Sequence, residues 1–410
     1  MESTVFIEKN QKMVYNSTGD IMNKRHQYGQ NIIQTLKRHG YDAYFVGGYV
    51  RDTILKRQTK DIDLTTSAPV EAIKPLFDKV ILTGEKYGTV TVIKPPFTYE
   101  VTTYRKDGSY SDHRRPDTVV YTDELKEDLA RRDFTINQLV MDEHGTIQDH
   151  FNGLEDLKAN LIRTINHPDD RFEEDALRML RAFRFAAKLG FTIEANTFKA
   201  IKHKHPLLVN VAVERIQNEL EEIFDARYVN HALALMINAN ISTTLNALHP
   251  GLTYLVKSPI PFNAEDAFTV LYLHNPKGCE FFKLSNTRIR DIDERIALYT
   301  ARKGQPFTPM DLYTYGKKRL EEVNKLNQLH GKKDQHDHII ELEKNLPIKS
   351  QKELTFKGPD ILKHFTLPHK KHVGIILRYL TEEVVNQRLD NTYETLKNAI
   401  ETYLEKSENS

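Results

Sequence analysis

One short stretch, residues 46–64, constrains the fold and the chemistry of this chain more than any other. Its sequence is VGGYVRDTILKRQTKDIDL. The residues before it, 41–46, predict a short buried strand, which Gly47 and Gly48 end, and residues 50–55 predict a helix. The first turn of that helix would present free backbone N–H groups, so the glycine turn can hold an anion such as a phosphate.

Two pairs of side chains add chemistry to this turn. Arg51 and Asp52 follow the glycines directly, where they offer a phosphate partner and a cap for the start of the helix. Asp61 and Asp63 are spaced i and i+2, so both carboxylates would leave one face of a predicted strand. Two like charges on one face repel unless a cation lies between them, and Mg²⁺ prefers carboxylate oxygens. Each feature alone is usually structural, but together they predict a nucleotide and magnesium site.

Composition limits the class of protein. The chain has 410 residues, with 58 Lys and Arg against 57 Asp and Glu and a formal net charge of +1. This length predicts two to four domains, and the balanced charge means that any basic surface for nucleic acid must be local. A single cysteine, Cys279, excludes a disulfide framework and a cysteine-based zinc site. We expect a cytoplasmic protein with no membrane partner, because no apolar run reaches the ~18 residues of a membrane span and the first residues lack a signal sequence.

Hydrophobic patterns divide the chain into a mixed part and a helical part. The mixed part is predicted to contain strands at 41–46, 61–66, 80–82, 89–93 and 99–105, and helices at 21–39, 70–77 and 130–141. The helical part is predicted to contain helices at 168–190, 213–224, 264–273 and 375–405. The segment 106–118 is basic and rich in turn formers, and is predicted to be a long mobile loop. The expected divisions are a frayed leader (1–20), an α+β head (21–150), and three helical domains (151–225, 226–345 and 346–410).

The predicted helix 168–190 carries an acid and three bases at intervals of three. They are Asp175, Arg178, Arg181 and Arg184. This spacing keeps successive side chains near one helix face, as a solvated ladder of ion pairs or as one functional cluster. Cytosine and adenine present an amine donor beside a ring-nitrogen acceptor, whereas guanine and uracil present a carbonyl beside an N–H. A carboxylate and a guanidinium one turn apart therefore fit C and A and oppose G and U.

Five stretches, in order along the chain, resemble one known family. They are VGGYVRD, the Asp61 and Asp63 pair, RRDFTIN at 131–137, EDALRMLRAFRFAAKLGF at 174–191 and ERIQNEL at 214–220. Together they resemble the ordered motifs of the bacterial-type (class II) tRNA nucleotidyltransferases, the CCA-adding enzymes. The resemblance implies an α+β head with a polymerase-beta-type nucleotidyltransferase sheet, followed by all-α neck, body and tail domains in an elongated chain.

The same resemblance implies an enzyme that adds C, C and A to the 3′ end of tRNA from CTP and ATP, without a nucleic-acid template. Its partners would be tRNA, CTP and ATP and its cofactor Mg²⁺, with a homodimer left open. Carried over by residue, Asp61 and Asp63 would be catalytic and would bind Mg²⁺. The residues that would contact the nucleotide are Gly48, Arg51, Arg132, Asp175, Arg178, Arg181 and Arg184.

Several alternatives stay open in the sequence. Glu100 is a candidate third catalytic carboxylate or a solvent-facing strand residue, because the alternation around it does not fix which face is buried. The related poly(A) polymerases have a similar head, but we expect them to carry an Arg-rich strand with a following His where this chain reads KYGTVTVI at 86–93. Enzymes that add only CC lack the basic loop that 105–115 retains. The rivals from other classes are a noncatalytic RNA-binding protein and an enzyme that transfers a nucleotide to a small molecule.

Overall fold

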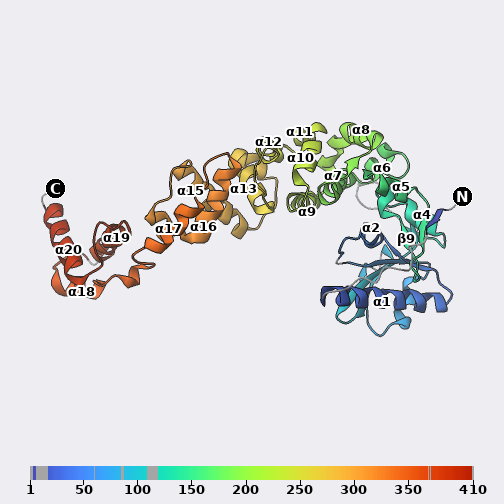
Figure 1. The fold of residues 1–410 in the computed structure, drawn as a ribbon, viewed down its shortest axis with the longest axis horizontal. Coiled ribbons are helices and arrows are strands. Elements are labelled where there is room, and N and C mark those ends of the chain that lie inside the picture. The colour runs from blue at the N-terminus through green and yellow to red at the C-terminus, as the bar shows by residue number, and fades with distance from the viewer. Residues whose placement is uncertain are drawn as a thin grey trace. The chain divides into compact units, whose positions relative to one another are not determined.

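The chain folds into a sheet-containing part followed by helices. The computed structural model describes residues 3–5, 17–59, 61–84, 87–108, 119–367, 369 and 371–408. These form two compact units, Met1–Leu252 and Thr253–Ser410. The first unit holds the sheet and the helices that follow it, and the second is helical (Figure 1). The predicted α+β head followed by all-α domains is therefore confirmed, while the domain boundaries near 150, 225 and 345 stay predictions.

The head is built on one mixed sheet of eight strands. Their order is β1-β10-β9-β2-β3-β6-β5-β4, in which β3 and β6 are the parallel pair. The strands are β1 (Ser3–Val5), β2 (Ala43–Val46), β3 (Asp63–Thr66), β4 (Val80–Gly84), β5 (Thr89–Lys94), β6 (Phe97–Thr103), β9 (Val140–Met141) and β10 (Ile147–Asp149). Two further pairs are β7 (Arg105–Asp107) with β8 (Val119–Tyr121), and β11 (Leu161–Ile162) with β12 (Thr192–Ile193). Most of the predicted loop 106–118, residues 109–118, lies outside the described residues.

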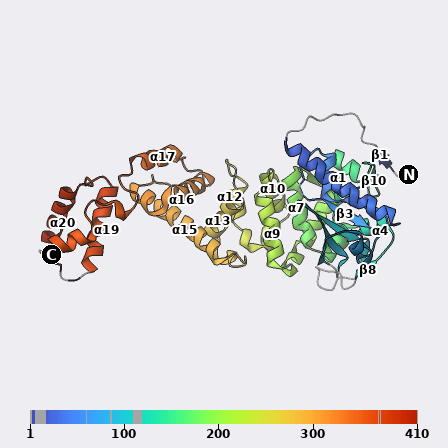
Figure 2. The ribbon, with the colours of Figure 1, turned by 90° about the horizontal axis from the view of Figure 1, so that it is seen from below.

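Helix α1 (Ser17–Arg38) covers part of this sheet. It packs against β2 and β3, and Figure 2 shows it alongside the sheet. Its apolar residues Ile32, Ile33 and Leu36 are buried. Within the predicted leader 1–20, three residues form β1 and α1 begins at Ser17.

The remaining helices follow the sheet strands along the chain. Those of the first unit are α2 (Gly48–Ile54), α3 (Val70–Ile73), α4 (Leu125–Ala130), α5 (Gly153–Lys158), α6 (Pro168–Glu174), α7 (Leu177–Leu189), α8 (Ala195–Lys204), α9 (Val213–Phe224), α10 (Val229–Asn238) and α11 (Ile241–Thr244). From residue 251 they are α12 (Gly251–Leu255), α13 (Ala264–His274), α14 (Pro276–Cys279), α15 (Asn286–Arg302), α16 (Pro309–Leu329), α17 (His336–Asn345), α18 (Gly358–His364), α19 (Lys371–Val385) and α20 (Tyr393–Glu408). A short 3₁₀ turn, η3 (Thr135–Asn137), lies between α4 and β9.

The prediction of one helix over 168–190 is wrong. The segment forms two helices, α6 and α7, which are separated at Asp175 and Ala176. Asp175 has an extended backbone (φ −144°, ψ 102°), and its Oδ1 accepts a hydrogen bond from the Leu177 N–H at 3.1 Å. An Asp side chain that binds a nearby backbone N–H competes with the helix for that donor. The three arginines therefore share one helix, α7, at intervals of three residues, whereas Asp175 precedes that helix.

Two other predicted helices are also interrupted. The segment 130–141 forms η3 and then β9, because Val140 and Met141 pair with β2 and β10 instead of continuing a helix. The segment 375–405 is divided between α19 and α20. At that division the Asn391 side chain accepts a hydrogen bond from the Thr355 N–H and donates one to the Glu353 carbonyl, both at 2.9 Å. Such side-chain bonds to the backbone stabilise turns.

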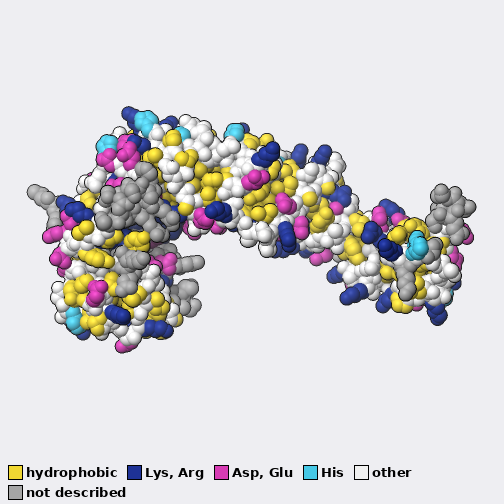
Figure 3. Space-filling view, turned by 180° about the vertical axis from the view of Figure 1, so that it is seen from behind, with side chains coloured by type: hydrophobic (Ala, Val, Ile, Leu, Met, Phe, Trp, Pro, Cys, Tyr) yellow, Lys and Arg dark blue, Asp and Glu magenta, His cyan; other side chains and the backbone are white. Residues whose placement is uncertain are grey.

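The surface carries both types of charge (Figure 3), and the single cysteine is buried in the second unit. On the face drawn in Figure 3, Lys and Arg side chains are scattered among Asp and Glu, in line with the near-equal totals of the two charge types. Cys279 is fully buried, and burial raises the pKa of its thiol to about 12, so it packs as a small apolar side chain. Among the described residues of both units, no helix has the length and apolar character of a membrane span.

Replacing Gly153 with alanine tests how closely α5 packs on η3. A Cβ at Gly153 would lie 2.5 Å from the carbonyl oxygen of Thr135 and 3.1 Å from its carbonyl carbon. Because this neighbour is backbone, η3 must shift to relieve the contact. We expect Gly153→Ala to lower the free energy of unfolding of the first unit by about 1–3 kcal/mol, measured by urea titration.

A matched control for that experiment lies in α19. A Cβ at Gly374 would meet nothing within 4 Å, so Gly374→Ala should leave the second unit unchanged or stabilise it by about 0.5–1 kcal/mol. If Gly153→Ala were as stable as the wild type, α5 and η3 would not be as close as the structure has them.

Candidate active site

The glycine turn lies where β2 meets α2. Gly47 has φ 75° and ψ −139°, a conformation that residues with a side chain rarely adopt, and α2 begins at Gly48. A Cβ at Gly47 would lie 3.7 Å from Oδ2 of Asp63 and 3.8 Å from Nη1 of Arg132. The absence of a side chain at Gly47 therefore keeps space open beside a carboxylate and a guanidinium.

Arg51 and Asp52 are buried in α2 and bind each other. The Nε of Arg51 donates to Oδ1 of Asp52 at 2.9 Å, and its Nη1 donates to Oδ1 of Asn137 at 2.6 Å. The expected cap by Asp52 is wrong, because Gly47 is the residue before the helix and no side chain caps it. Burial lowers the pKa of Arg51, and the charge of Asp52 opposes that shift. Asp52 thus neutralises Arg51 from within the helix.

The two predicted metal carboxylates have different surroundings. β3 begins at Asp63, so Asp61 precedes the strand, and its side chain is 91% exposed and 3.8 Å from Nη2 of Arg25. Asp63 is half-buried and lies in register with Glu100 in the parallel pair of β3 and β6. Residues in register point to the same face of a sheet, so Glu100 lies beside Asp63. Glu100 is exposed, as its alternative interpretation predicted.

Asp63 has the electrostatic character of a cation ligand. Its pKa is raised to about 6: burial raises it most, the charges of Glu100 and Asp61 also raise it, and the charge of Arg132 lowers it. A cation beside Asp63 would favour the charged carboxylate and reverse this shift. Among the described residues, no group of three or more His, Cys, Asp or Glu side chains is arranged to hold a metal. Asp61 and Asp63 therefore fit a hard divalent cation that takes its other ligands from phosphates and water.

A buried carboxylate holds the two arginines that follow α4. Asp128 accepts hydrogen bonds from Arg131, at 2.9 Å from Nε and 2.8 Å from Nη2, and from Nη2 of Arg132 at 3.1 Å. Burial raises the pKa of Asp128, but the charges of Arg132 and Arg131 outweigh it and the pKa is lowered. The Nε of Arg132 is buried with no hydrogen-bond partner in the part of the chain that the structure describes. Arg132 is thus held beside Asp63, and its Nε–H group is available to a ligand.

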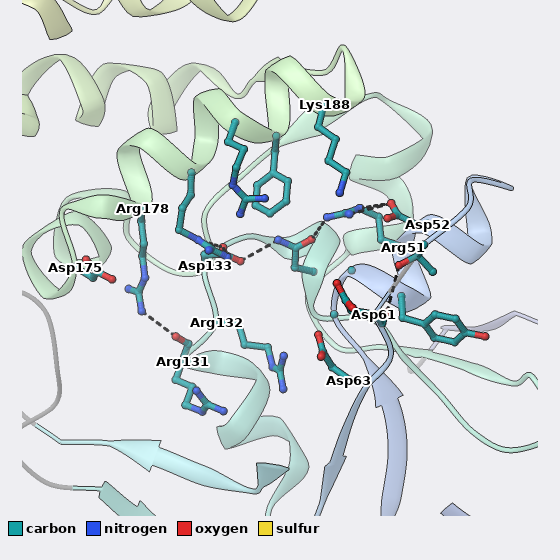
Figure 4. Close-up of a pocket in the computed structure, with 18 of the residues that line it drawn as sticks. Arg51, Asp52, Asp61, Asp63, Arg131, Arg132, Asp133, Asp175, Arg178 and Lys188 are labelled. Carbon is teal, nitrogen blue, oxygen red and sulfur yellow. Dashed lines mark hydrogen bonds and ion pairs between the residues drawn. The ribbon is translucent and has the colours of Figure 1, made fainter. Parts of the chain in front are cut away.

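The glycine turn, the carboxylates of Asp61 and Asp63, and the guanidinium groups of Arg51, Arg131 and Arg132 line a pocket of about 610 Å³ (Figure 4). Nine of the predicted site residues line it: Gly48, Arg51, Asp61, Asp63, Arg132, Asp175, Arg178, Arg181 and Arg184. Glu100, the tenth, is not part of the lining. The lining residues that the sequence did not assign to the site are Tyr49, Thr59, Tyr87, Arg105, Arg131, Asp133, Asn137, Phe185, Lys188 and Arg215.

Asp175 and Arg178 lie near each other in the pocket, each with other partners (Figure 4). Both oxygens of Asp175 accept hydrogen bonds from Arg215, at 3.3 and 2.8 Å. Arg178 donates from Nη1 to Oε2 of Glu174 at 2.6 Å and from Nη2 to the carbonyl of Arg131 at 3.0 Å. The two side chains are therefore held in fixed positions by their neighbours.

Asp133 connects α7 to α2. Its Oδ2 accepts hydrogen bonds from Nε and Nη2 of Arg181 at 2.8 and 2.5 Å, and its Oδ1 accepts one from Nδ2 of Asn137 at 3.0 Å. Asn137 in turn accepts the hydrogen bond from Arg51. Burial raises the pKa of Asp133, but the charge of Arg181 and the hydrogen bonds outweigh it and hold that pKa well below its usual range.

The ring of Phe185 lies among three arginines. Its centroid is 4.4 Å from Cζ of Arg184, 5.1 Å from Cζ of Arg51 and 5.7 Å from Cζ of Arg181. Arg184 also donates from Nε to Oε2 of Glu219 at 2.6 Å. An aromatic face attracts cations, so Phe185 lets guanidinium groups from α2 and α7 gather at the floor of the pocket.

Some of the unassigned residues had a usable sequence signal. Asp133 and Asn137 belong to RRDFTIN, and Arg215 belongs to ERIQNEL. The sequence therefore marked these stretches, but it did not show which side chains within them bind the site residues. Phe185 and Lys188 lie in the stretch EDALRMLRAFRFAAKLGF. On a helix, however, an apolar residue of a site looks like one of the core, and a lysine of a site looks like one of the surface.

Three family descriptions match parts of the chain. "Poly A polymerase head domain" matches residues 43–163, which contain the glycine turn and the aspartates. "Probable RNA and SrmB- binding site of polymerase A" matches residues 190–255. "tRNA nucleotidyltransferase domain 2 putative" matches residues 267–400.

Relatives and solved structures match almost the whole chain. The CCA-adding enzyme of Streptococcus pyogenes serotype M2 (strain MGAS10270) is 36% identical over 383 residues, which cover 89% of this chain and 94% of that protein. The crystal structure of the Bacillus stearothermophilus CCA-adding enzyme in complex with CTP aligns with a TM-score of 0.81 and 33% identity, over 94% of this chain and 99% of that chain. The Thermotoga maritima CCA-adding enzyme complexed with tRNA, at 17% identity and a TM-score of 0.66 over 94% of this chain and 96% of that chain, shares the fold. This chain belongs to the family of CCA-adding enzymes.

Proposed function

We propose that this chain adds C, C and A to the 3′ end of tRNA from CTP and ATP, without a nucleic-acid template, and releases pyrophosphate. The observation that carries the proposal is one pocket lined both by Asp61 and Asp63 and by Asp175 and Arg178. The first pair suits metal-assisted transfer of a nucleotide, and the second suits recognition of a base. The similar proteins support it, because they are named CCA-adding enzymes and the Bacillus stearothermophilus structure contains CTP.

The proposed reaction is attack of the tRNA 3′-oxygen on the α-phosphorus of the nucleotide. A new bond forms between them, the bond from the α-phosphorus to the bridging oxygen breaks, and pyrophosphate leaves. Mg²⁺ held by Asp61 and Asp63 would make the 3′-hydroxyl more acidic and offset the charge of the phosphates. Arg132 lies beside Asp63 with its Nε unpaired among the described residues, so it suits a contact to the nucleotide. Glu100 stays a predicted third carboxylate.

Base selection is proposed for Asp175 and Arg178. The carboxylate of Asp175 would accept a hydrogen bond from the exocyclic amine of cytosine or adenine, and Arg178 would donate one to the neighbouring ring nitrogen. Arg215 and Glu174 hold the two groups before a nucleotide arrives. A fixed pair of this kind discriminates well, because it cannot rotate to suit a carbonyl beside an N–H. Arg181 and Arg184 bind Asp133 and Glu219, so we assign them to the support of the pocket.

The other partners follow from the same proposal. tRNA, CTP and ATP are the proposed ligands and Mg²⁺ the proposed metal. The homodimer stays open, and the cytoplasmic location expected from the sequence stays a prediction.

The proposal is tested with tRNA that lacks its terminal CCA, labelled CTP or ATP, and Mg²⁺. We expect two C residues and then one A to be added, with no product from UTP or GTP. Asp61→Asn and Asp63→Asn should each slow the addition of both nucleotides by roughly 100-fold or more, because each replaces a negatively charged metal ligand with a neutral amide. Binding of tRNA, measured by filter retention, should survive both changes. A tail of A alone would favour poly(A) addition, the activity that the name of the head family suggests.

The raised pKa of Asp63 predicts a pH dependence of metal binding. Below about pH 6 the carboxylate is protonated, and protonation competes with a cation. Mn²⁺ affinity, measured by calorimetry, should fall about tenfold for each pH unit below that pKa and be constant above about pH 7. Asp63→Asn should bind Mn²⁺ weakly, with an affinity that does not depend on pH. If the affinity of the wild type were constant between about pH 5 and pH 7, the assignment of Asp63 as a metal ligand would be wrong.

Asp63 also predicts a change of stability in the absence of metal. Its pKa in the folded chain, about 6, is above the unfolded value of about 3.9. The folded state therefore binds the proton more tightly, and stability falls as the pH rises from the lower pKa to the higher one. Asp63→Asn should raise the melting temperature at pH 8 and leave it unchanged at pH 3. An equal effect at both pH values would show that the charge of Asp63 is not the cause.

Asp175→Ala tests the base-reading pair. It removes the proposed acceptor for the exocyclic amine, which should reduce the preference for C and A over U and G by about 1–3 kcal/mol, or roughly 5- to 150-fold in the ratio of kcat/KM values. All four nucleotides should be measured on one tRNA. Arg215→Met is the matched control, because it breaks the same ion pair but keeps the carboxylate. If both variants lost stability while the preference stayed unchanged, Asp175 would be a structural residue.

A further inference from the structure

Lys188 lines the pocket, but the sequence motifs assign no role to it. It lies in the last turn of α7 and lines the same pocket as the aspartates. Its backbone carbonyl accepts a hydrogen bond from Nη2 of Arg57 at 3.0 Å, which joins the end of α7 to the segment after α2. Its side chain extends from α7 toward Arg51 (Figure 4). The ammonium group is therefore directed into the pocket, although the residue is exposed to solvent.

Seven of the lining arginines, in contrast, carry their own counter-ions. Arg51 is paired with Asp52, and Arg181 with Asp133. Ion pairs also hold Arg131, Arg132, Arg178, Arg184 and Arg215. No residue in the described part of the chain forms a hydrogen bond or an ion pair with the side chain of Lys188. A cation that has no counter-ion of its own is available to an anionic ligand.

The position of Lys188 in the pocket indicates which part of a bound nucleotide it would contact. In Figure 4 its ammonium group lies near Arg51, on the other side of the pocket from Asp175 and Arg178. Arg51 lies in α2 directly after the glycine turn, where phosphates are expected, whereas Asp175 and Arg178 are the proposed base readers. A nucleoside triphosphate remains anionic after one divalent cation has bound, so its terminal phosphates still need a positive partner. Arg51 is balanced by Asp52, and Lys188 supplies the missing charge.

We propose that Lys188 binds the terminal phosphates of the incoming nucleotide and then the pyrophosphate that leaves. This inference rests on the proposed function, because it assigns a residue to the leaving group of that reaction. The phosphates of the tRNA 3′ end have the same chemistry, and the test must distinguish the two sources. An ammonium group on a flexible chain suits this task, because it can follow pyrophosphate as it departs.

The test compares Lys188→Ala and Lys188→Arg with Lys158→Ala. Lys158 is an exposed lysine of α5 outside the pocket lining, so its variant makes the same change of charge elsewhere in the unit. The measurements are KM for CTP and for ATP at saturating tRNA, KM for tRNA, and the inhibition constant of pyrophosphate. Lys188→Ala should raise both nucleotide KM values and the pyrophosphate constant by about tenfold, the size expected for a charge-assisted contact. Lys188→Arg should recover most of the loss, and KM for tRNA should not change.

Each other outcome has a defined meaning. Unchanged nucleotide KM values and an unchanged pyrophosphate constant would overturn the inference. A rise confined to KM for tRNA would also overturn it, and would assign Lys188 to the tRNA backbone. Binding of pyrophosphate in the presence of Mg²⁺ can also be measured by calorimetry, which does not require the enzyme to turn over. If the wild type extended no tRNA but bound pyrophosphate about tenfold more tightly than Lys188→Ala, the proposed function would fail and the phosphate contact would stand.

Discussion

Two arginines of the pocket, Arg181 and Arg51, are connected through one buried carboxylate, Asp133. It is the shared acceptor for Arg181 from α7 and for Asn137 from η3, and Asn137 accepts the hydrogen bond of Arg51 from α2. Guanidinium groups that gather around one space repel each other, and removing an acid from such a buried set leaves unpaired charge, which is costly. Asp133 thus sets the distance between the part of the pocket beside the glycine turn and the part beside α7. A pocket that must hold both ends of one nucleotide requires that distance to be constant.

The sequence predicted the parts of the site that local patterns encode. Gly47 and Gly48 were found because a strand, two glycines and a helix make a recognisable turn, and Asp61 and Asp63 because two like charges at i and i+2 are unusual. The structure brings these residues into one pocket with the arginines of α7. The α+β head followed by helices was predicted because alternating apolar residues end near residue 150 and helical periodicity continues to the C-terminus.

The remaining features depend on contacts between distant residues, which one sequence does not display. The break at Asp175 is invisible to periodicity, because the apolar stripe continues across it and the Arg215 that holds the carboxylate lies 40 residues later. Glu100 was ambiguous for the same reason: only the register of β3 with β6 sets it beside Asp63. Lys188 has no local signal at all, since its role depends on which neighbouring cations already have partners.

Asp63 and Asp133 show how one pocket prepares two carboxylates for opposite partners. Both lose hydration on folding, which raises the pKa of a carboxyl group. At Asp133 the charge of Arg181 and several hydrogen bonds outweigh this loss, so the carboxylate is fully ionised and has no need of a further cation. At Asp63 the nearby charges of Glu100 and Asp61 add to it, and Arg132 offsets it only in part, so the pKa remains raised. The ionised form of Asp63 is therefore the one group of the two whose energy a divalent cation can lower substantially. The protein satisfies the carboxylate of Asp133, which supports Arg181, and leaves unsatisfied the carboxylate of Asp63, which is the proposed metal ligand.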